Sequence, residues 1–156
     1  MKKIFGKRWI RRESLVEQVR GLTRTAAGQG SPEMTRYLIS FNDGAMDHIP
    51  AEDMPDVGKA ANAVAQEAVN AGVWVYGAGL ERQRASVVAT DGLVTDGPYP
   101  ETKEVIGGFA VVDVATREEA LQWAAKIAVA CRCAQEVREL MPDPEQDDML
   151  REAAGR

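Results

Sequence analysis

The side chains best suited to chemistry lie in one segment, residues 94–109, with the sequence VTDGPYPETKEVIGGF. Asp96, Gly97 and Pro98 predict a tight turn, because Asp bonds nearby backbone, Gly accepts positive φ and Pro fixes φ at about −65°. A carboxylate, a phenol and an ammonium group follow one another here on Asp96, Tyr99 and Lys103. A constrained loop carrying such groups predicts the wall of a small-molecule site.

The single histidine of the chain, His48, lies in the segment DGAMDHIP, close in sequence to Asp43 and Asp47. Histidine titrates near neutral pH and acts as a general base when a carboxylate orients it. Asp96, across a cleft, is the natural orienting group, so His48 and Asp96 form our candidate catalytic pair. The alternatives are that His48 is a solvated loop residue and that Asp96 only caps its own turn.

The rest of the turn offers candidate ligand-binding groups. The Tyr99 ring and hydroxyl can line a cleft or fill a dimer core. A positioned Lys or Thr can hold an anionic substrate, whereas a charged loop is otherwise solvated or salt-bridged. The candidate ligand-binding residues are Tyr99, Glu101, Thr102 and Lys103.

Two glycines close the segment. Gly107 and Gly108 predict a close backbone approach or a bulge where the chain re-enters a sheet. Neither the GxGxxG nor the GxxxxGK[ST] phosphate-binding pattern accompanies them. The glycine pair therefore predicts architecture rather than nucleotide binding.

Alternating strand and helix patterns position these groups. Their order, β-α-β-(hairpin)-β-α-β, is the split βαβ pattern, so we predict an α+β, ferredoxin-like fold with an antiparallel sheet and both helices on one face. Asp91-Gly92 predicts a type I′ turn in the hairpin, and a Thr-Arg-Glu-Glu capping box opens the second helix. The expected strands are 36–41, 73–76, 86–89, 93–95, 109–114 and 133–141, and the expected helices are 53–71 and 116–130.

The uncovered second face of that sheet predicts a partner. It would carry apolar side chains such as Val75 and Val111, which are costly to leave in water. Closure against a second copy follows, because most oligomers are symmetric homo-oligomers. We therefore expect a homodimer.

Length and composition favour one compact, water-soluble domain. The chain has 156 residues, 45% of them hydrophobic. We expect a basic arm and linker at 1–33, the domain at 34–144 and a polar tail at 145–156. There is no apolar run of about 20 residues and no secretory leader pattern, so we expect no membrane span and a cytoplasmic location. Cys131 and Cys133 are expected to be structural thiols, and no metal or cofactor is predicted.

Charge is distributed unevenly. Residues 1–33 hold eight Lys or Arg and three Glu, a net charge of +5, and the remainder carries −10 within the total of −5. An acidic body repels nucleic-acid phosphate, so we expect no nucleic-acid binding by the body. The arm is open to three interpretations: an amphipathic helix from Ser14, a disordered tail, or sequence upstream of a start at Met34.

The stretch from Thr35 to about Pro144 resembles the YCII-related family, and in particular its DGPF-type members. The resemblance is carried by RYLISF, AGVWV, TDGPYPETKE, IGGFAVVDV, EEALQWAAKIA and EVREL. It implies a ferredoxin-like fold that dimerises into an α+β barrel with a cleft beside the turn. In the enzyme-like relatives a His on the first helix pairs with an Asp, but residues 53–71 contain no His, so the implied dyad is incomplete.

Two hypotheses of function follow. The first is a small dimeric enzyme or ligand-binding protein with acid–base chemistry on a small polar or aromatic compound beside the DGPY turn. The second is a noncatalytic regulatory partner of a sigma factor, because some DGPF-type relatives are linked with extracytoplasmic-function sigma factors. A closed pocket favours the first hypothesis, and an exposed docking patch favours the second.

Overall fold

The computed structural model describes residues 33–82, 85–99 and 104–155. Residues 1–32 of the predicted arm, with the helix considered from Ser14, lie outside these ranges. The elements in chain order are β1 (Thr35–Asn42), η1 (Ala51–Asp53), α2 (Met54–Asn70), β2 (Trp74–Gly79), β3 (Ser86–Val88), β4 (Val94–Asp96), β5 (Ile106–Val114), α3 (Arg117–Cys131), β6 (Glu136–Glu139) and α4 (Pro144–Ala154).

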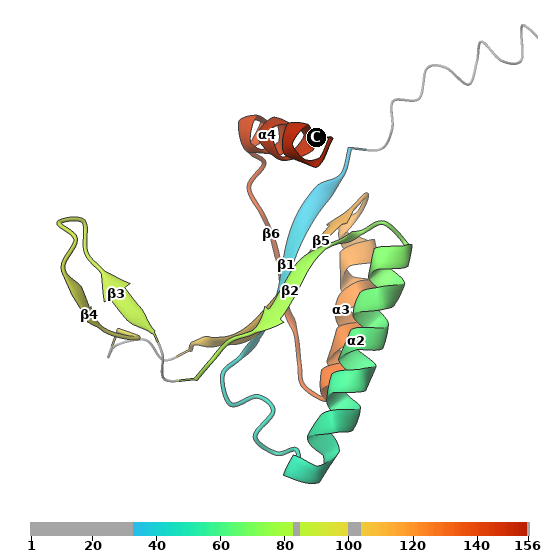
Figure 1. The fold of residues 1–156 in the computed structure, drawn as a ribbon. Coiled ribbons are helices and arrows are strands. Elements are labelled where there is room, and N and C mark those ends of the chain that lie inside the picture. The colour runs from blue at the N-terminus through green and yellow to red at the C-terminus, as the bar shows by residue number, and fades with distance from the viewer. Residues whose placement is uncertain (1–32, 83–84, 100–103, 156) are drawn as a thin grey trace, which may run out of the picture. The chain divides into compact units, whose positions relative to one another are not determined.

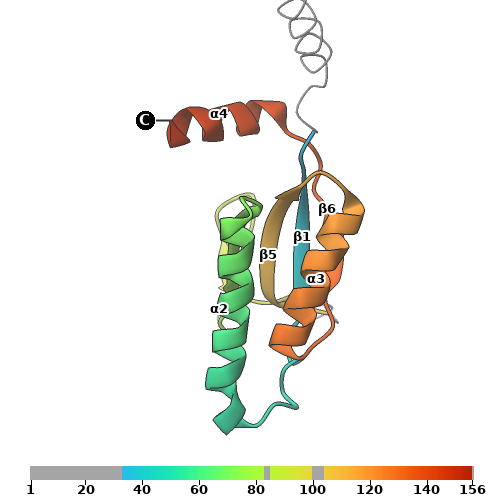
Figure 2. The same cartoon turned by 90° about the vertical axis from the view of Figure 1, so that its right-hand side faces the viewer.

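Four strands form an antiparallel sheet in the order β2-β5-β1-β6. The central pair β1 and β5 runs in register from Thr35 opposite Val114 to Phe41 opposite Gly108. Helices α2 and α3 lie side by side on one face of this sheet (Figure 1, Figure 2). The predicted ferredoxin-like α+β fold, with both crossover helices on one face, is confirmed.

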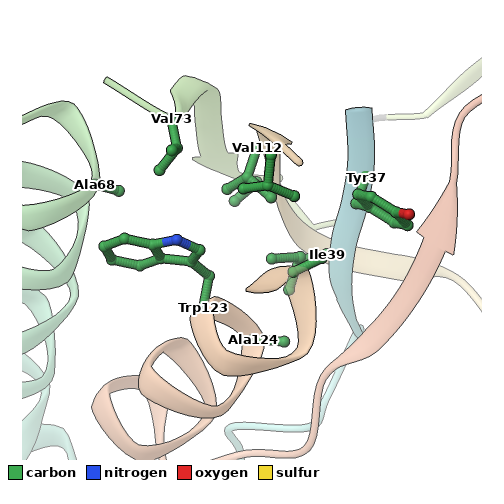
Figure 3. Packing of buried hydrophobic residues seen from close by; sticks show 10 residues of the cluster. Tyr37, Ile39, Ala68, Val73, Val112, Trp123 and Ala124 are labelled. Atoms are coloured by element: carbon green, nitrogen blue, oxygen red, sulfur yellow. The ribbon is translucent and has the colours of Figure 1, made fainter. Parts of the chain in front are cut away.

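The core lies between that face and the two helices. Along β5 the side chains alternate, with Ala110, Val112 and Val114 buried and the residues between them partly exposed. Figure 3 shows the Trp123 indole of α3 packed among Ala68 of α2 and the sheet residues of the same cluster. Ala68 of α2 is fully buried in this cluster, so its small side chain lets the helix contact the sheet at that point.

Helix α3 begins and ends with strong capping. The Thr116 hydroxyl accepts from the Glu119 N–H at 3.2 Å, and Glu119 Oε2 accepts from the Ala115 N–H at 3.4 Å. The capping box is therefore confirmed, with its return bond one residue earlier than usual. The helix ends at Arg132, whose φ is +53°, and the Cys133 N–H donates to the Ala128 carbonyl at 3.2 Å.

This C-terminal cap explains why β6 is shorter than predicted. Residues 133–135 complete the helix end, since the Gln135 side chain donates to the Cys133 carbonyl at 3.2 Å. Pairing with β1 starts only at Glu136, opposite Ser40, and stops at Glu139, opposite Tyr37. The predicted strand 133–141 is therefore reduced to its middle.

The hairpin at 86–96 is present but forms its own two-stranded sheet, β3 with β4. It extends from the side of the main sheet that lies away from α2 and α3 (Figure 1). The type I′ prediction is wrong, because Gly92 has a φ of +87° whereas Asp91 is not at positive φ. Instead the Gly92 N–H donates to the Ala89 carbonyl at 2.9 Å, and the Asp91 carboxylate accepts from the Leu93 N–H at 3.0 Å.

The segment predicted as a polar tail folds into α4. Asp143 caps it by accepting from the Gln146 N–H at 3.0 Å, and Pro144 occupies the first turn. No residue of α4 is buried, and its link to the sheet is a 2.5 Å ion pair between Arg36 Nη1 and Asp147 Oδ1. None of the described helices has the length and hydrophobicity needed to cross a membrane.

Candidate functional site

A cleft of about 470 Å³ lies beside the Asp-Gly-Pro-Tyr turn. Its walls come from the end of β1, the connection after β2, the start of β5 and the turn itself. We call it the DGPY cleft. Its lining residues are Asp43, Leu80, Glu81, Arg82, Ala85, Pro98, Val105, Ile106 and Gly107.

Backbone hydrogen bonds fix these walls to one another. Two of them join segments that are distant in sequence and the third closes the base of the β3–β4 hairpin, so the cleft depends on one end of the sheet rather than on a single loop. The bonds run from Asp43 N–H to the Val105 carbonyl (2.6 Å), from Leu80 N–H to the Gly107 carbonyl (2.9 Å) and from Gly97 N–H to the Ala85 carbonyl (2.9 Å).

The glycine pair makes the close packing at the cleft possible. A β-carbon on Gly107 would lie 2.9 Å from Cα of Asp43, and one on Gly108 would lie 2.5 Å from Cε1 of Phe41. The β1–β5 register also shifts between Phe41 and Asn42. The predicted close approach and irregularity at Gly107 and Gly108 are both confirmed.

Arg82 organises the charged side of the cleft. Its Nε donates to Asp43 Oδ1 at 2.8 Å, and its Nη2 donates to Asp47 Oδ1. The hydrogen bonds to these carboxylates raise the pKa of the Arg82 guanidinium, and the bond to Asp47 has the larger effect. Arg82 is not part of any motif that predicts a site in the sequence. The signal lay in Asp43 and Asp47, which flank a glycine turn with both carboxylates free to accept one guanidinium.

The candidate catalytic residues occupy separate elements. His48 lies exposed in the loop between β1 and η1, next to the buried Ile49, and Asp96 lies exposed at the end of β4. Among the described residues, neither side chain has a hydrogen bond or ion pair with another group. Their pairing therefore stays a prediction, and the acidic neighbours of His48 in the sequence are engaged with Arg82.

The candidate ligand-binding residues are described only in part. Tyr99 follows Pro98 at the cleft and is 62% exposed, but it is not among the residues that line the cavity. Glu101, Thr102 and Lys103 lie outside the described residues.

The two thiols differ in burial, with Cys131 buried and Cys133 partly exposed. Burial raises the pKa of the Cys131 thiol, with Cys133 adding to the effect. Burial also raises the pKa of Cys133, opposed by its hydrogen bond from Gln135. In the part of the chain that the structure describes, no group of three His, Cys, Asp or Glu side chains is arranged to hold a metal ion.

The sheet topology, the helices on one face and the cleft at a proline turn define a ferredoxin-like α+β protein with a cleft at one end of its sheet. The model of the YCII-related domain matches residues 48–142, well over half of the chain, and the protein belongs to that family. A search of curated proteins found no match. The matched region begins after β1, although β1 is a central strand of the sheet.

Proposed function

We propose that the protein is a homodimer that binds a small molecule in the DGPY cleft. The observation that carries this proposal is the cleft itself, because about 470 Å³ falls within the roughly 300–1,000 Å³ typical of ligand sites. The lining residues Pro98, Val105, Ile106 and Gly107 belong to the segment 94–109, where the sequence predicts the wall of a site.

The lining favours a small polar compound with an apolar or aromatic part. Leu80, Val105 and Ile106 provide an apolar wall, while Glu81 and Asp43 provide acceptors. Arg82 is already paired with two carboxylates, so it contributes shape and hydrogen-bond donors rather than a free positive charge. A ligand with its own donor groups suits this wall best.

Binding is better supported than catalysis. A general base needs a carboxylate or substrate within about 3 Å, and His48 has no such partner among the described residues. Acid–base chemistry at His48 and Asp96 therefore requires the ligand or a second copy to bring the two groups together. If turnover of a bound compound is found, His48→Gln should abolish it while leaving binding intact.

The homodimer is supported by the uncovered face of the sheet. Alternation places Leu38, Phe109 and Val111 opposite the buried helix-facing residues. Tyr76 adds a ring whose centroid is 6.1 Å from that of Phe109, and it is 61% exposed. Aromatic and aliphatic groups gathered on one open sheet face are typical of an interface.

The dimer is tested by sedimentation velocity on the full chain. Val111→Lys places a charge on the uncovered face and should shift the protein to the monomer. Val129→Lys, on the solvent side of α3 where the residue is 80% exposed, should leave the dimer unchanged. A wild-type protein that sediments as a monomer at micromolar concentration would refute this part of the proposal.

Ligand binding is tested by thermal shift against a pool of metabolites. A ligand at about 100 times its Kd stabilises a protein by roughly 2.7 kcal/mol. Leu80→Trp should fill the cleft and remove the shift. Leu93→Trp, at the hairpin tip with 62% exposure, is the matched control. An absence of hits, combined with capture of a sigma factor by the wild-type chain, would favour the regulatory alternative.

A further inference from the structure

A second cavity, of about 260 Å³, lies between the helix-covered face of the sheet and helices α2 and α3. It is distinct from the DGPY cleft, because none of the described residues lines both. Its walls combine aromatic rings, small residues and uncharged polar groups. The lining residues are Phe41, Ala61, Asn62, Ala65, Trp74, Gly77, Ala78, Gly79, Phe109, Ala110, Ile127, Cys131 and Gln135.

The aromatic walls of this cavity are held in place by glycines. The Trp74 indole lies against Gly77, where a β-carbon would come within 2.6 Å of Cζ2. The Phe41 ring lies in the same manner against Gly108 in the neighbouring strand. Because both rings rest on backbone, neither fills the space under α2, and the small side chains of Ala61 and Ala65 leave that space open.

The polar groups of the cavity are all uncharged. Asn62 from α2 and Gln135 after α3 contribute side-chain amides, and Cys131 contributes a thiol. Cys131 is only 8% exposed and has no hydrogen-bond partner among the described residues. A thiol is a weak donor and acceptor, and a buried neutral one favours a neutral ligand. Among the residues that the structure describes, no Asp, Glu, Lys, Arg or His side chain lines the cavity.

We propose that this cavity binds a neutral aromatic molecule of about one ring with a single hydrogen-bonding substituent. A dry apolar cavity of roughly 150 Å³ already accommodates benzene, so the space here suffices for a substituted ring. The Phe41 and Trp74 rings offer stacking or edge contacts. The Asn62 amide and Oε1 of Gln135, whose Nε2 donates to the Cys133 carbonyl, receive the polar substituent. This proposal is independent of ligand binding in the DGPY cleft.

The test is titration of the full-length protein with phenol and with toluene, followed by calorimetry and by chemical-shift changes of the Trp74 indole N–H. Phenol should bind more tightly than toluene, because only phenol can use the amides. Ala65→Leu should fill the cavity and weaken phenol binding at least tenfold. Ala63→Leu, at an exposed position of the same helix, should leave the affinity unchanged.

Two further variants keep the outcome decisive. Ala61→Val reduces the cavity by less than Leu does, and it serves if Ala65→Leu fails to fold. Leu80→Trp should not alter phenol binding, which separates this cavity from the DGPY cleft. Absence of phenol binding at millimolar concentration, or phenol affinity that Ala65→Leu and Ala61→Val leave unchanged, would overturn the proposal.

Discussion

Gly107 lies directly against the backbone of Asp43. A β-carbon at position 107 would come within 2.9 Å of Asp43 Cα and 3.0 Å of the Asp43 nitrogen. Backbone atoms cannot rotate away as the end of a side chain can, so β5 can approach the end of β1 only with glycine here. The same approach brings Val105 within reach of the Asp43 N–H and thereby forms one wall of the DGPY cleft.

Gly107→Ala should therefore destabilise the protein by about 1–3 kcal/mol, the usual cost of overpacking. Gly79→Ala is the matched control, because a β-carbon on Gly79 meets nothing within 4 Å. Urea unfolding of both variants measures the difference. Equal stability of the two variants would contradict the close approach.

Asp147→Ala should release α4 from the sheet. The 2.5 Å pair with Arg36 joins side chains that are less than a third exposed, so its loss should cost about 1 kcal/mol. Amide exchange in α4 should then rise roughly fivefold while exchange in β1 and β5 stays unchanged. Asp148→Ala removes only a pair within α4, with Arg151, and should leave that exchange close to wild type.

Thr116→Ala should weaken the start of α3. Loss of the hydroxyl that accepts from Glu119 leaves a helix N–H without its cap, at a cost of about 0.5–2 kcal/mol. Thr90→Ala, at an exposed position of the hairpin loop, should change the free energy of unfolding by less than about 0.5 kcal/mol. Thermal and urea unfolding would each reveal whether the cap contributes as expected.

Alkaline pH should destabilise the protein in part through Cys131. Burial raises the pKa of this thiol in the folded protein. The contribution of the neutral thiol to the free energy of unfolding is therefore fully present below the pKa of the unfolded state, about 8.5, and is lost as pH rises through the pKa of the folded state. Between pH 8.5 and 9.5 the loss from one thiol is at most about 1.4 kcal/mol.

Urea unfolding across this range tests the thiol. Cys131→Ser cannot ionise there, so its free energy of unfolding should fall less steeply with pH than that of the wild type. Cys133→Ser should have a smaller effect, because Cys133 is less buried. An unchanged pH dependence in Cys131→Ser would exclude this thiol as a source of the alkaline loss.

The order of the elements could be predicted from the sequence because each carries a strong local signal. The Thr116 capping box and the strand predicted at 109–114 are examples, and both agree with the structure. The predicted turn and strand boundaries were wrong where a side chain or backbone group makes a hydrogen bond to a nearby residue instead. Asp91 uses its carboxylate to hold the Leu93 N–H, which gives a different turn, and residues after Arg132 complete a helix cap rather than a strand.

The candidate site was predictable only where it coincides with the turn. Pro98 and Gly107 do line a cleft, as the bent segment indicated. Arg82 was not predicted because its partners, Asp43 and Asp47, are 39 and 35 residues earlier in the chain. Such pairing is set by sheet topology rather than by local pattern. The second cavity, between the sheet and helices α2 and α3, exists because its glycine and alanine residues have little or no side chain to fill the space. No sequence motif indicates such a space.

The strand order has a consequence for how this chain acquires its shape. Strands β1 and β2 do not pair with each other, and each pairs with β5, which is later in the chain. A nascent chain emerging from the ribosome therefore carries both strands without a partner until Ile106–Val114 has been synthesised. Since such distant pairings slow folding, the interval before β5 emerges is when an exposed segment such as RYLISF is most vulnerable to aggregation or to capture by a chaperone.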